Sequence, residues 1–569
     1  MHLAEKDGRS TFFWGLLSFA VSLLPFFLLE AKWGGGHPLR SFSDDSLLVW
    51  NLLAGLISGD ARPFQSLVIP RMAAPFSPLV FSEGFPITEQ LQLSILKGIS
   101  FFLRDPIELG DFYYLAGYPL AAIAFYFSAI YLRVRPPIAF GLSLAFAYLP
   151  FHWIRYDHLF LSHYWVLAPA AAILQFSVGA PLRGRRDTAL IGLASLFLFA
   201  WHAYYGFFFY GMLALIFLFR AIRERGFWAR GAGLLVISGV AAGVALGVST
   251  FHYSFARRHA IDPPAEFSRP WGEGRLYGMR ASAVLFPVGN HRVPALASLR
   301  AWYAKQVPTR EGVDESLGTL ALFGIFISVL AFYRVLRRKK ASTVISELGL
   351  CAGLVFLFAS PWGVATALSR WVTPIFRCPN RISPMLGAFA LFGVGIWISR
   401  RTENTSHGRL KLACWGVFLA LFAVWDQVPT VPYDPKPIET VTALREFGAR
   451  IDERVGKGSV LQLPVVPFPE SPPVQRMLDY AHATGPLFSR SAQFSYGAWK
   501  GTRAFAQIAE VARDPLSVER LRSFGYSGLW IDRFGYPDSA DGLIADLRRK
   551  LGRVPVESSD GRRVFFELP

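Results

Sequence analysis

The residues best suited to chemistry form an acidic pair, Asp44 and Asp45, directly after Ser43. Ser43 is a good helix N-cap, and carboxylates in a first helical turn are stabilised by the helix dipole. The leucines that follow recur at a spacing of four, which predicts a helix with one apolar face lying at a membrane surface. Such a helix would hold a carboxylate beside the head group of a lipid-linked substrate. The alternative is that both acids only cap the helix.

Two arginines four residues apart, Arg377 and Arg381, lie in a proline-broken apolar segment. On a helical turn they would point the same way, as two cations that grip one phosphate must. A broken segment of this kind predicts a re-entrant or interfacial piece that lines a cavity. Arg280 belongs to a further stretch, 250–315, in which arginines and histidines alternate with Trp and Tyr, a composition that suits phosphate and sugar. Head-group anchoring is the alternative for the Arg377 and Arg381 pair.

A third polar group contains Arg155, His158 and His163. Ionisable side chains at membrane depth are costly and tend to face a cavity or a partner. The two histidines are five apart, so they do not share one helical face as a zinc-binding pair would. Hydrogen-bonding or proton-handling roles are therefore preferred over metal binding, with a plain aromatic belt as the alternative. Weaker candidates for substrate contacts are acids that could also be ordinary helix caps: Glu83, Glu89 and Glu315.

The elements that must position these residues are mainly membrane helices. Of 569 residues, 53% are hydrophobic and only 17% are charged, against about 25% charged in soluble domains. This composition excludes a soluble fold and a disordered chain. A membrane-spanning helix needs about 20 apolar residues. Runs of this kind predict eleven transmembrane helices, at 11–30, 112–131, 137–154, 160–180, 188–202, 203–220, 230–249, 316–334, 344–361, 382–399 and 412–428.

The charges follow the topology of these helices. The first run lacks a cleavage site and follows two basic residues, which predicts a retained signal anchor with its N-terminus inside. The six loops that then become cytoplasmic hold 20 Lys and Arg and five acids, so they contain most of the net charge of +18. The basic excess is a topology signal, and no nucleic-acid partner is expected. We expect a bacterial-type cytoplasmic (inner) membrane protein with its C-terminus outside.

Three segments then project to the outer side: 31–111, 250–315 and a tail of 429–569. The chain is therefore predicted to consist of a transmembrane domain, 1–428, and an extracytoplasmic α/β domain, 429–569, which follows a stiff proline-rich linker. Within the tail, alternation and turn signals predict strands at 459–463 and 528–531, helices at 515–523 and 540–551, and a hairpin at 554–568.

The order of these features resembles the GT-C superfamily of integral-membrane glycosyltransferases. The residues that carry the resemblance are 43–50, 85–98, 155–158 and 377–381, and the similarity of layout covers nearly the whole chain. The resemblance implies a polytopic α-helical membrane protein with interfacial helices in its first outer loop and a C-terminal α/β domain. It also implies transfer of a hexose or pentose from a polyprenyl-phosphate donor to a glycan, lipid or protein acceptor. Membrane lipids and the lipid-linked sugar are thus the expected partners.

Carried over by position, the resemblance implies that Asp44 or Asp45 acts as general base on the acceptor hydroxyl, while Arg377 and Arg381 hold the leaving phosphate. No cofactor is expected. Adjacent acids cannot both face one site on a regular helix, and no later acidic motif completes a metal site, so a metal-independent reaction is favoured over one with a divalent metal. Two proline- and aromatic-rich tail segments, 464–470 and 496–501, could receive a carbohydrate, with ordinary loop packing as the alternative.

Two other classes of protein share this layout. A transporter or flippase for lipid-linked sugars would have similar spans and a basic cavity. Transport favours charged groups near mid-membrane on broken helices, in two matching halves, and the sequence has neither feature. A non-catalytic protein of envelope assembly is the third hypothesis. The sequence leaves the sugar, the acceptor and the linkage open.

Overall fold

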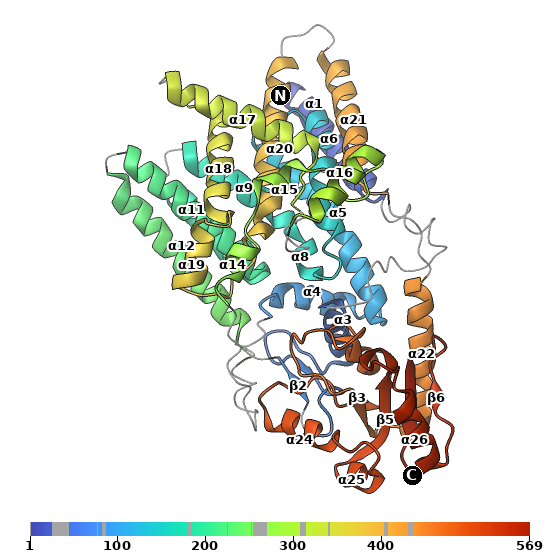
Figure 1. Cartoon of the computed structure of the whole chain (residues 1–569). Helices are drawn as coiled ribbons and strands as arrows, with labels where there is room; N and C mark the ends of the chain where they lie inside the picture. The colour runs from blue at the N-terminus through green and yellow to red at the C-terminus, as the bar shows by residue number, and fades with distance from the viewer. Residues whose placement is uncertain are drawn as a thin grey trace.

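The computed structural model describes residues 2–24, 45–76, 78–81, 87–179, 184–224, 226–251, 253, 270–307, 315–338, 342–402, 408–430 and 436–569. Long helices gather at one end of the molecule, and a small sheet with its own helices forms the other end (Figure 1). Eight helical segments within these ranges are long and apolar enough to cross a membrane. The chain is therefore an integral membrane protein. The predicted site residues Asp44 and Glu83 lie outside the described residues.

Each predicted span overlaps a helix, although residues 25–30 of the first predicted span lie outside the described residues. These helices are α1 (His2–Ser22), α5 (Pro106–Tyr131), α6 (Pro136–Ala147), α9 (Leu167–Gly179), α10 (Arg185–Trp201), α11 (Ala203–Arg223), α12 (Phe227–Ser249), α17 (Thr319–Arg338), α18 (Val344–Ala359), α20 (Ser383–Thr402) and α21 (Gly408–Gln427). Helices α1, α6 and α10 are not among the eight segments long and apolar enough to cross a membrane, so the total of eleven spans stays a prediction. The break predicted near His202 is confirmed, since α10 ends at Trp201 and α11 begins at Ala203.

Helix α20 forms the core of the bundle. Nearly all of its side chains are buried, and it packs against α6, α9, α17 and α18. The peripheral helices α12, α17 and α21 bury only a few residues each and leave Val, Leu and Phe side chains exposed. Hydrocarbon accommodates such a surface, whereas water does not. The bundle therefore buries one apolar core and presents a second apolar surface to the lipid.

The first outer loop forms α3 (Asp45–Ser58), a hairpin of β1 (Val68–Ile69) and β2 (Leu79–Val80), and α4 (Gln90–Ile99). The predicted helix at the acidic pair is confirmed, with Asp45 as its first residue. The helix was expected to lie on the membrane surface with its polar face exposed, and its observed surroundings differ from this expectation. Helix α3 packs against α4, α5 and the tail, which together bury most of its side chains. Contacts on several sides thus hold the position of Asp45.

The tail contains α22 (Lys436–Val455) and a five-stranded sheet in the order β4-β3-β5-β7-β6. The strands are β3 (Ser459–Leu463), β4 (Gln493–Phe494), β5 (Tyr526–Asp532), β6 (Val556–Glu557) and β7 (Arg563–Glu567), of which β3, β4 and β5 are parallel and β7 is antiparallel to its neighbours. The remaining helices are η4 (Ala481–Ala483), α23 (Thr484–Phe488), α24 (Arg503–Val511), α25 (Val518–Ser523), η5 (Arg533–Gly535) and α26 (Asp541–Leu551). The strands and helices predicted for the tail are confirmed to within a few residues. Helix α22 is an addition to them.

The first outer loop also completes the edge of the tail's sheet. The backbone N–H of Phe494 in β4 donates to Arg71 O (2.8 Å), and the N–H of Ala74 donates back to Phe494 O (2.9 Å). Next to them, Ala73 N–H donates to Tyr496 O (2.8 Å), and the Ala73 side chain lies in the core of the tail. The domain boundary at 428 stays a prediction. Backbone hydrogen bonds nevertheless join residues 71–74 to the tail's sheet across this boundary.

Candidate functional site

Asp45 and His158 meet at the end of the bundle that faces the tail. Asp45 is the first residue of α3, and His158 is the residue before α8 (Leu159–Ser162). Asp45 Oδ2 lies 3.3 Å from His158 Nε2, and the two side chains are 42% and 29% exposed. A carboxylate that is partly exposed and contacts an imidazole can accept a proton from a molecule in solution. The sequence predicts both residues as candidates, and the structure brings them together.

Buried contacts on both sides fix the position of Asp45. The Trp50 ring of α3 packs edge-on against Tyr156, 6.0 Å between ring centroids, and the Tyr156 hydroxyl donates to the buried carboxylate of Asp111 on α5. On the other side, the Asn51 amide donates to Ala483 O in the tail (2.9 Å). A buried hydrogen bond of this kind is costly to leave unmade. The bundle and the tail therefore both hold the helix that presents Asp45.

A second acid, Glu89, lies buried against His202 in the break between α10 and α11. Glu89 Oε1 is 3.4 Å from His202 Nε2 and accepts a hydrogen bond from the Thr88 hydroxyl (3.0 Å). His202 Nδ1 accepts the N–H of Tyr204 (3.2 Å), which leaves the proton of a neutral His202 on Nε2, facing Glu89. Burial raises the pKa of Glu89 to about 7, although its own hydrogen bonds and the charge of Arg381 partly oppose the shift.

The raised pKa of Glu89 predicts a pH-dependent stability. Between pH 4.5 and 7 the folded protein keeps this carboxyl protonated while the unfolded chain ionises, so stability falls as pH rises through that window, by about 3 kcal/mol in all. Glu89→Gln removes this loss. The melting temperature of the variant minus that of wild type should therefore increase from pH 4.5 to pH 7 and stay constant above pH 7. Thermal unfolding in detergent across pH 4.5 to 8.5 measures it, with exposed Glu446→Gln as control. A wild-type-to-variant difference that does not change with pH would contradict the assignment.

The two predicted phosphate-binding arginines do not share a helical turn. Arg377 precedes the short helix η3 (Pro379–Ile382), and Arg381 lies within it, because Cys378 before Pro379 takes a non-helical conformation with ψ of 72°. The expectation of a common helical face is therefore wrong. Both residues nevertheless contact Tyr204: the backbone N–H of Arg377 donates to the Tyr204 hydroxyl (3.1 Å), and the buried Arg381 guanidinium lies 5.1 Å from the ring centroid.

Arg377 also joins two segments far apart in the chain. Its guanidinium lies 3.0 Å from Glu273 in α14 (Glu273–Leu276) and 3.5 Å from Glu470 in the tail. Glu470 belongs to the segment predicted as a carbohydrate contact, whereas Glu273 is absent from the residues that the sequence indicates. The guanidinium of Arg377 is therefore already paired with two carboxylates, those of Glu273 and Glu470.

Acidic groups from the bundle and the tail surround Tyr480. Burial raises the pKa of the Tyr480 hydroxyl, and the charges of Asp45, Asp479 and Glu470 raise it further. Glu470 N–H donates to this hydroxyl (3.3 Å), while Tyr480 N–H donates to Asp479 (2.8 Å). Sequence patterns miss Asp479 and Tyr480, because both lie in an irregular stretch without motif or periodicity. Their left-handed turn, with Tyr480 φ of 61°, is visible only in the structure.

The Asp45 and Arg381 groups are linked through His202. This side chain lies within electrostatic reach of both Arg381 and His158, and His158 contacts Asp45. The structure thus gathers Asp45, Glu89, His158, Arg377 and Arg381 around the junction of bundle, first outer loop and tail. His202 was visible in the sequence only as part of the polar island that divides two spans. We call this group the junction site.

The other predicted residues occupy different surroundings. Arg155 is buried with its guanidinium 4.9 Å from the Phe151 ring, within electrostatic reach of Tyr205. His163 is buried and stacks on Tyr113, with Nε2 2.7 Å from the Tyr113 carbonyl oxygen.

Arg280 and Glu315 form a pair of their own before α17, where the Arg280 N–H donates to Glu315 Oε2 (2.9 Å). Arg280 caps α15 (Ala281–Leu285), which is followed by α16 (Pro294–Ala304). Substrate contacts by Arg155, His163, Arg280 and Glu315 stay predictions.

The two tail segments predicted to receive a carbohydrate are packed rather than open. The rings of Phe468, Tyr496 and Trp499 are buried and meet edge to face, and Trp499 Nε1 donates to Val80 O (3.2 Å). These three rings therefore pack as ordinary loop residues, which was the alternative to carbohydrate binding. In the part of the chain that the structure describes, no three His, Cys, Asp or Glu side chains are placed to hold a metal ion.

No protein-family model and no curated protein matches the chain. Three solved membrane enzymes are similar in structure. An oligosaccharyltransferase from Archaeoglobus fulgidus, in complex with Zn and sulfate, is 13% identical with a TM-score of 0.47 over 97% of this chain and 72% of its own. ArnT from Cupriavidus metallidurans, bound to undecaprenyl phosphate, is 15% identical with a TM-score of 0.46 over 98% of both chains. The arabinofuranosyltransferase AftD from Mycobacteria is 13% identical with a TM-score of 0.48 over 98% of this chain and 40% of its own.

Two of these neighbours are named as transferases of an oligosaccharide and of an arabinofuranosyl group. At this level of similarity, what the chain does has to be inferred from its own side chains at the junction site.

Proposed function

We propose that the chain is a glycosyltransferase of the GT-C superfamily in a bacterial-type cytoplasmic membrane, with the tail on the outer side. It moves a sugar from a polyprenyl-phosphate donor to an extracytoplasmic acceptor. The observation that supports this best is the presence at the junction site of a carboxylate, Asp45, in contact with His158, and of the Arg381 guanidinium over Tyr204. The Arg377 guanidinium lies nearby, held by Glu273 and Glu470. One base and a cationic site for a leaving phosphate are what such a transfer requires.

In the proposed reaction the acceptor hydroxyl oxygen attacks the anomeric carbon of the donor sugar. Its proton passes to Asp45, the bond between the anomeric carbon and the phosphate oxygen breaks, and the lipid phosphate leaves with the electron pair. His158 holds the Asp45 carboxylate from the side at 3.3 Å. The guanidinium of Arg381 stabilises the negative charge that grows on the leaving phosphate. A metal-independent reaction, which the sequence favours, is part of the proposal.

A lipid donor agrees with the location of the junction site. It lies where the membrane helices end, beside α4 and its exposed neighbours Phe101 and Phe102, which suit the membrane interface. A polyprenyl chain can stay in the bilayer while its phosphate reaches Arg381. The tail supplies Asp479 and Tyr480, and Tyr480 lies within electrostatic reach of Asp45. The Asp479 carboxylate and the Tyr480 hydroxyl can hydrogen-bond the hydroxyls of an acceptor.

The direct test is sugar transfer by the purified chain in proteoliposomes, with a panel of polyprenyl-phosphate sugars as donors. Transfer of label from donor to a water-soluble or lipid acceptor supports the proposal. The alternative from the sequence, a flippase, predicts movement of the intact donor between leaflets without cleavage of its sugar-phosphate bond. Protease protection of the tail in intact cells tests its outer location separately.

Glu470→Gln tests how Arg377 is used. Glu470 competes with phosphate for this guanidinium, and a partly exposed ion pair contributes about 1 kcal/mol or less. We therefore expect the donor KM to fall about two- to fivefold, with little change in kcat. Donor titrations at low and high salt measure the effect, which salt should weaken. Glu453→Gln, an exposed acid of α22, is the matched control, and an unchanged donor KM in the Glu470 variant would rule out the competition.

A further inference from the structure

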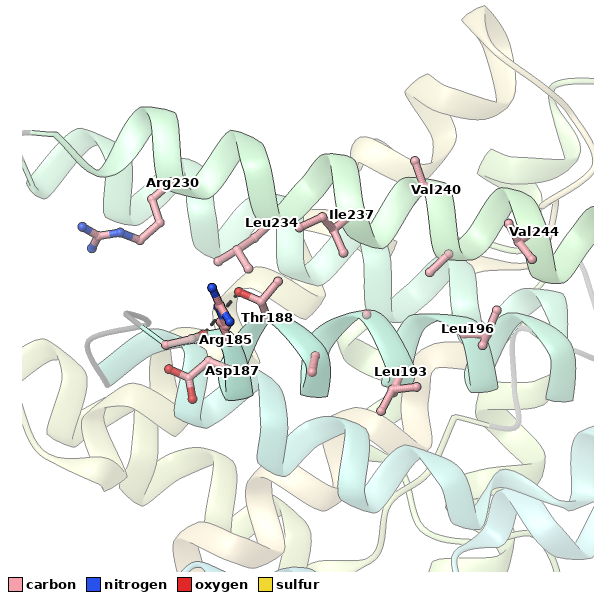
Figure 2. A pocket seen from close by; sticks show the side chains of 14 residues that line it. Arg185, Asp187, Thr188, Leu193, Leu196, Arg230, Leu234, Ile237, Val240 and Val244 are labelled. Carbon is pink, nitrogen blue, oxygen red and sulfur yellow. Dashed lines mark hydrogen bonds between the residues drawn. The ribbon is translucent and has the colours of Figure 1, made fainter.

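A groove of about 840 Å³ runs along the outer surface of α10 and α12 (Figure 2). It begins at the first turn of α10, the end of that helix opposite His202 and the junction site. Its α12 wall belongs to a segment long and apolar enough to cross a membrane. The positive-inside rule places its starting end on the cytoplasmic side.

The walls of the groove are apolar and open. Leu193 of α10 and Val240 of α12 are 64% and 62% exposed, and the remaining wall is also aliphatic. The two helices also contact each other away from the groove lining, through a hydrogen bond between the buried hydroxyls of Ser195 and Ser238. Gly192 keeps the two helices close, because a Cβ there would already touch the Ile237 side chain at 3.4 Å. Small side chains where the two helices meet thus leave the groove between two rows of larger side chains.

Two arginines lie at the cytoplasmic end of this groove. Arg185 and Arg230 line it from α10 and α12, and both are exposed. Within the described part of the chain, no acid lies at ion-pair distance from either; Glu224 acts on Arg230 only at longer range, since its carboxylate is held by Arg220 at 2.9 Å. Asp187 also lines this end, but Figure 2 shows it pointing away from α12. The end is therefore net positive, beside the positive end of the α10 dipole.

We propose that this groove binds one anionic phospholipid of the cytoplasmic leaflet. Its phosphate lies between Arg185 and Arg230, and one acyl chain lies along Leu193, Ile237 and Val240. The 15 residues from Arg230 to Val244 rise by about 21 Å along the helix, and half of a bilayer core is about 15 Å, so the groove is long enough for a chain of one leaflet. Guanidinium groups bind phosphate oxygens through charge-assisted hydrogen bonds. This inference rests on the membrane location alone and does not depend on the proposed transferase activity.

The experiment is native mass spectrometry of the full-length protein released from nanodiscs that contain phosphatidylglycerol and phosphatidylcholine. Wild type should retain phosphatidylglycerol selectively. The double variant Arg185→Ala/Arg230→Ala should retain it about 25-fold less, because each arginine near an anionic lipid contributes about fivefold. The matched control is Arg337→Ala/Arg338→Ala, a basic pair at the end of α17 outside the groove. Helix content and melting temperature verify that each variant is folded.

A second variant, Val240→Trp, fills the groove and keeps both arginines. Loss of phosphatidylglycerol in this variant supports a groove, whereas full retention would mean that the arginines attract lipid without one and would overturn the proposal. Equal retention by wild type and the double-arginine variant would overturn it as well. A dimer that dissociates on Val240→Trp would show instead that a second copy covers this surface. Sugar transfer should be unchanged in all three variants, so failure of the lipid proposal leaves the junction site untouched.

Discussion

Asp45→Asn should lower the kcat/KM of sugar transfer about 10²- to 10⁴-fold, the contribution typical of a positioned general base. The amide keeps the size and the hydrogen-bond contact with His158 but cannot take the acceptor proton at neutral pH. The loss should therefore appear in kcat, while donor binding and the melting temperature change little. Single-turnover transfer from a labelled polyprenyl-phosphate sugar measures it.

Asp60→Asn is the matched control for this substitution, because Asp60 follows the far end of the same helix and accepts a hydrogen bond from the nearby Ser58 hydroxyl. It should keep wild-type activity. Asp44→Asn decides between the two adjacent acids. If Asp44→Asn abolishes transfer while Asp45→Asn retains it, the base is Asp44, and the proposed role of Asp45 is wrong. Full activity in both variants would remove the carboxylate mechanism altogether.

Arg381→Ala should reduce transfer about 10²- to 10³-fold, comparable to the loss of one fixed donor at a developing anion. The guanidinium is buried over Tyr204 and near Glu89, so solvent screens it little. Arg381→Lys should recover only part of the activity, because an ammonium keeps the charge but loses the planar fork that matches phosphate. Because the charge grows as the phosphate leaves, kcat should fall more than donor affinity.

Arg370→Ala provides the comparison for Arg381. Arg370 also follows the α18 span, on α19 (Val364–Trp371), and lies over the Trp271 ring at 4.8 Å, outside the junction site. Its removal should leave transfer nearly unchanged. Equal losses in the Arg370 and Arg381 variants would indicate a general requirement for outer positive charge. In that case, the specific role of Arg381 at the leaving phosphate would be refuted.

The helices could be predicted because apolar length and charged flanks act locally along the chain. The break at His202 followed from its polar neighbours, and the start of α3 followed from the acidic pair, now seen at Asp45. The tail's hairpin was equally visible, since Gly561 takes the positive φ that such a turn needs. Each of these features is determined by residues close together in sequence.

Contacts between distant segments could not be predicted in this way. Glu470 reaches Arg377 only because the tail folds over one end of the bundle, and no local pattern indicates that pairing. The separation of Arg377 from Arg381 depends on one proline, Pro379, within a segment whose spacing favoured a helical turn. The burial of α3 has the same origin, since the covering surface comes from the opposite end of the chain.

The shared sheet edge at Ala73, Ala74 and Phe494 has a consequence for how such proteins can change over time. A tail replaced by recombination would arrive without the strand partner that protects its open edge, and the recipient loop would lose the neighbour that orients α3. The tail and the Asp45 helix are therefore expected to be inherited as one unit. New acceptor preferences would then arise by substitutions within this unit more readily than by exchange of whole modules.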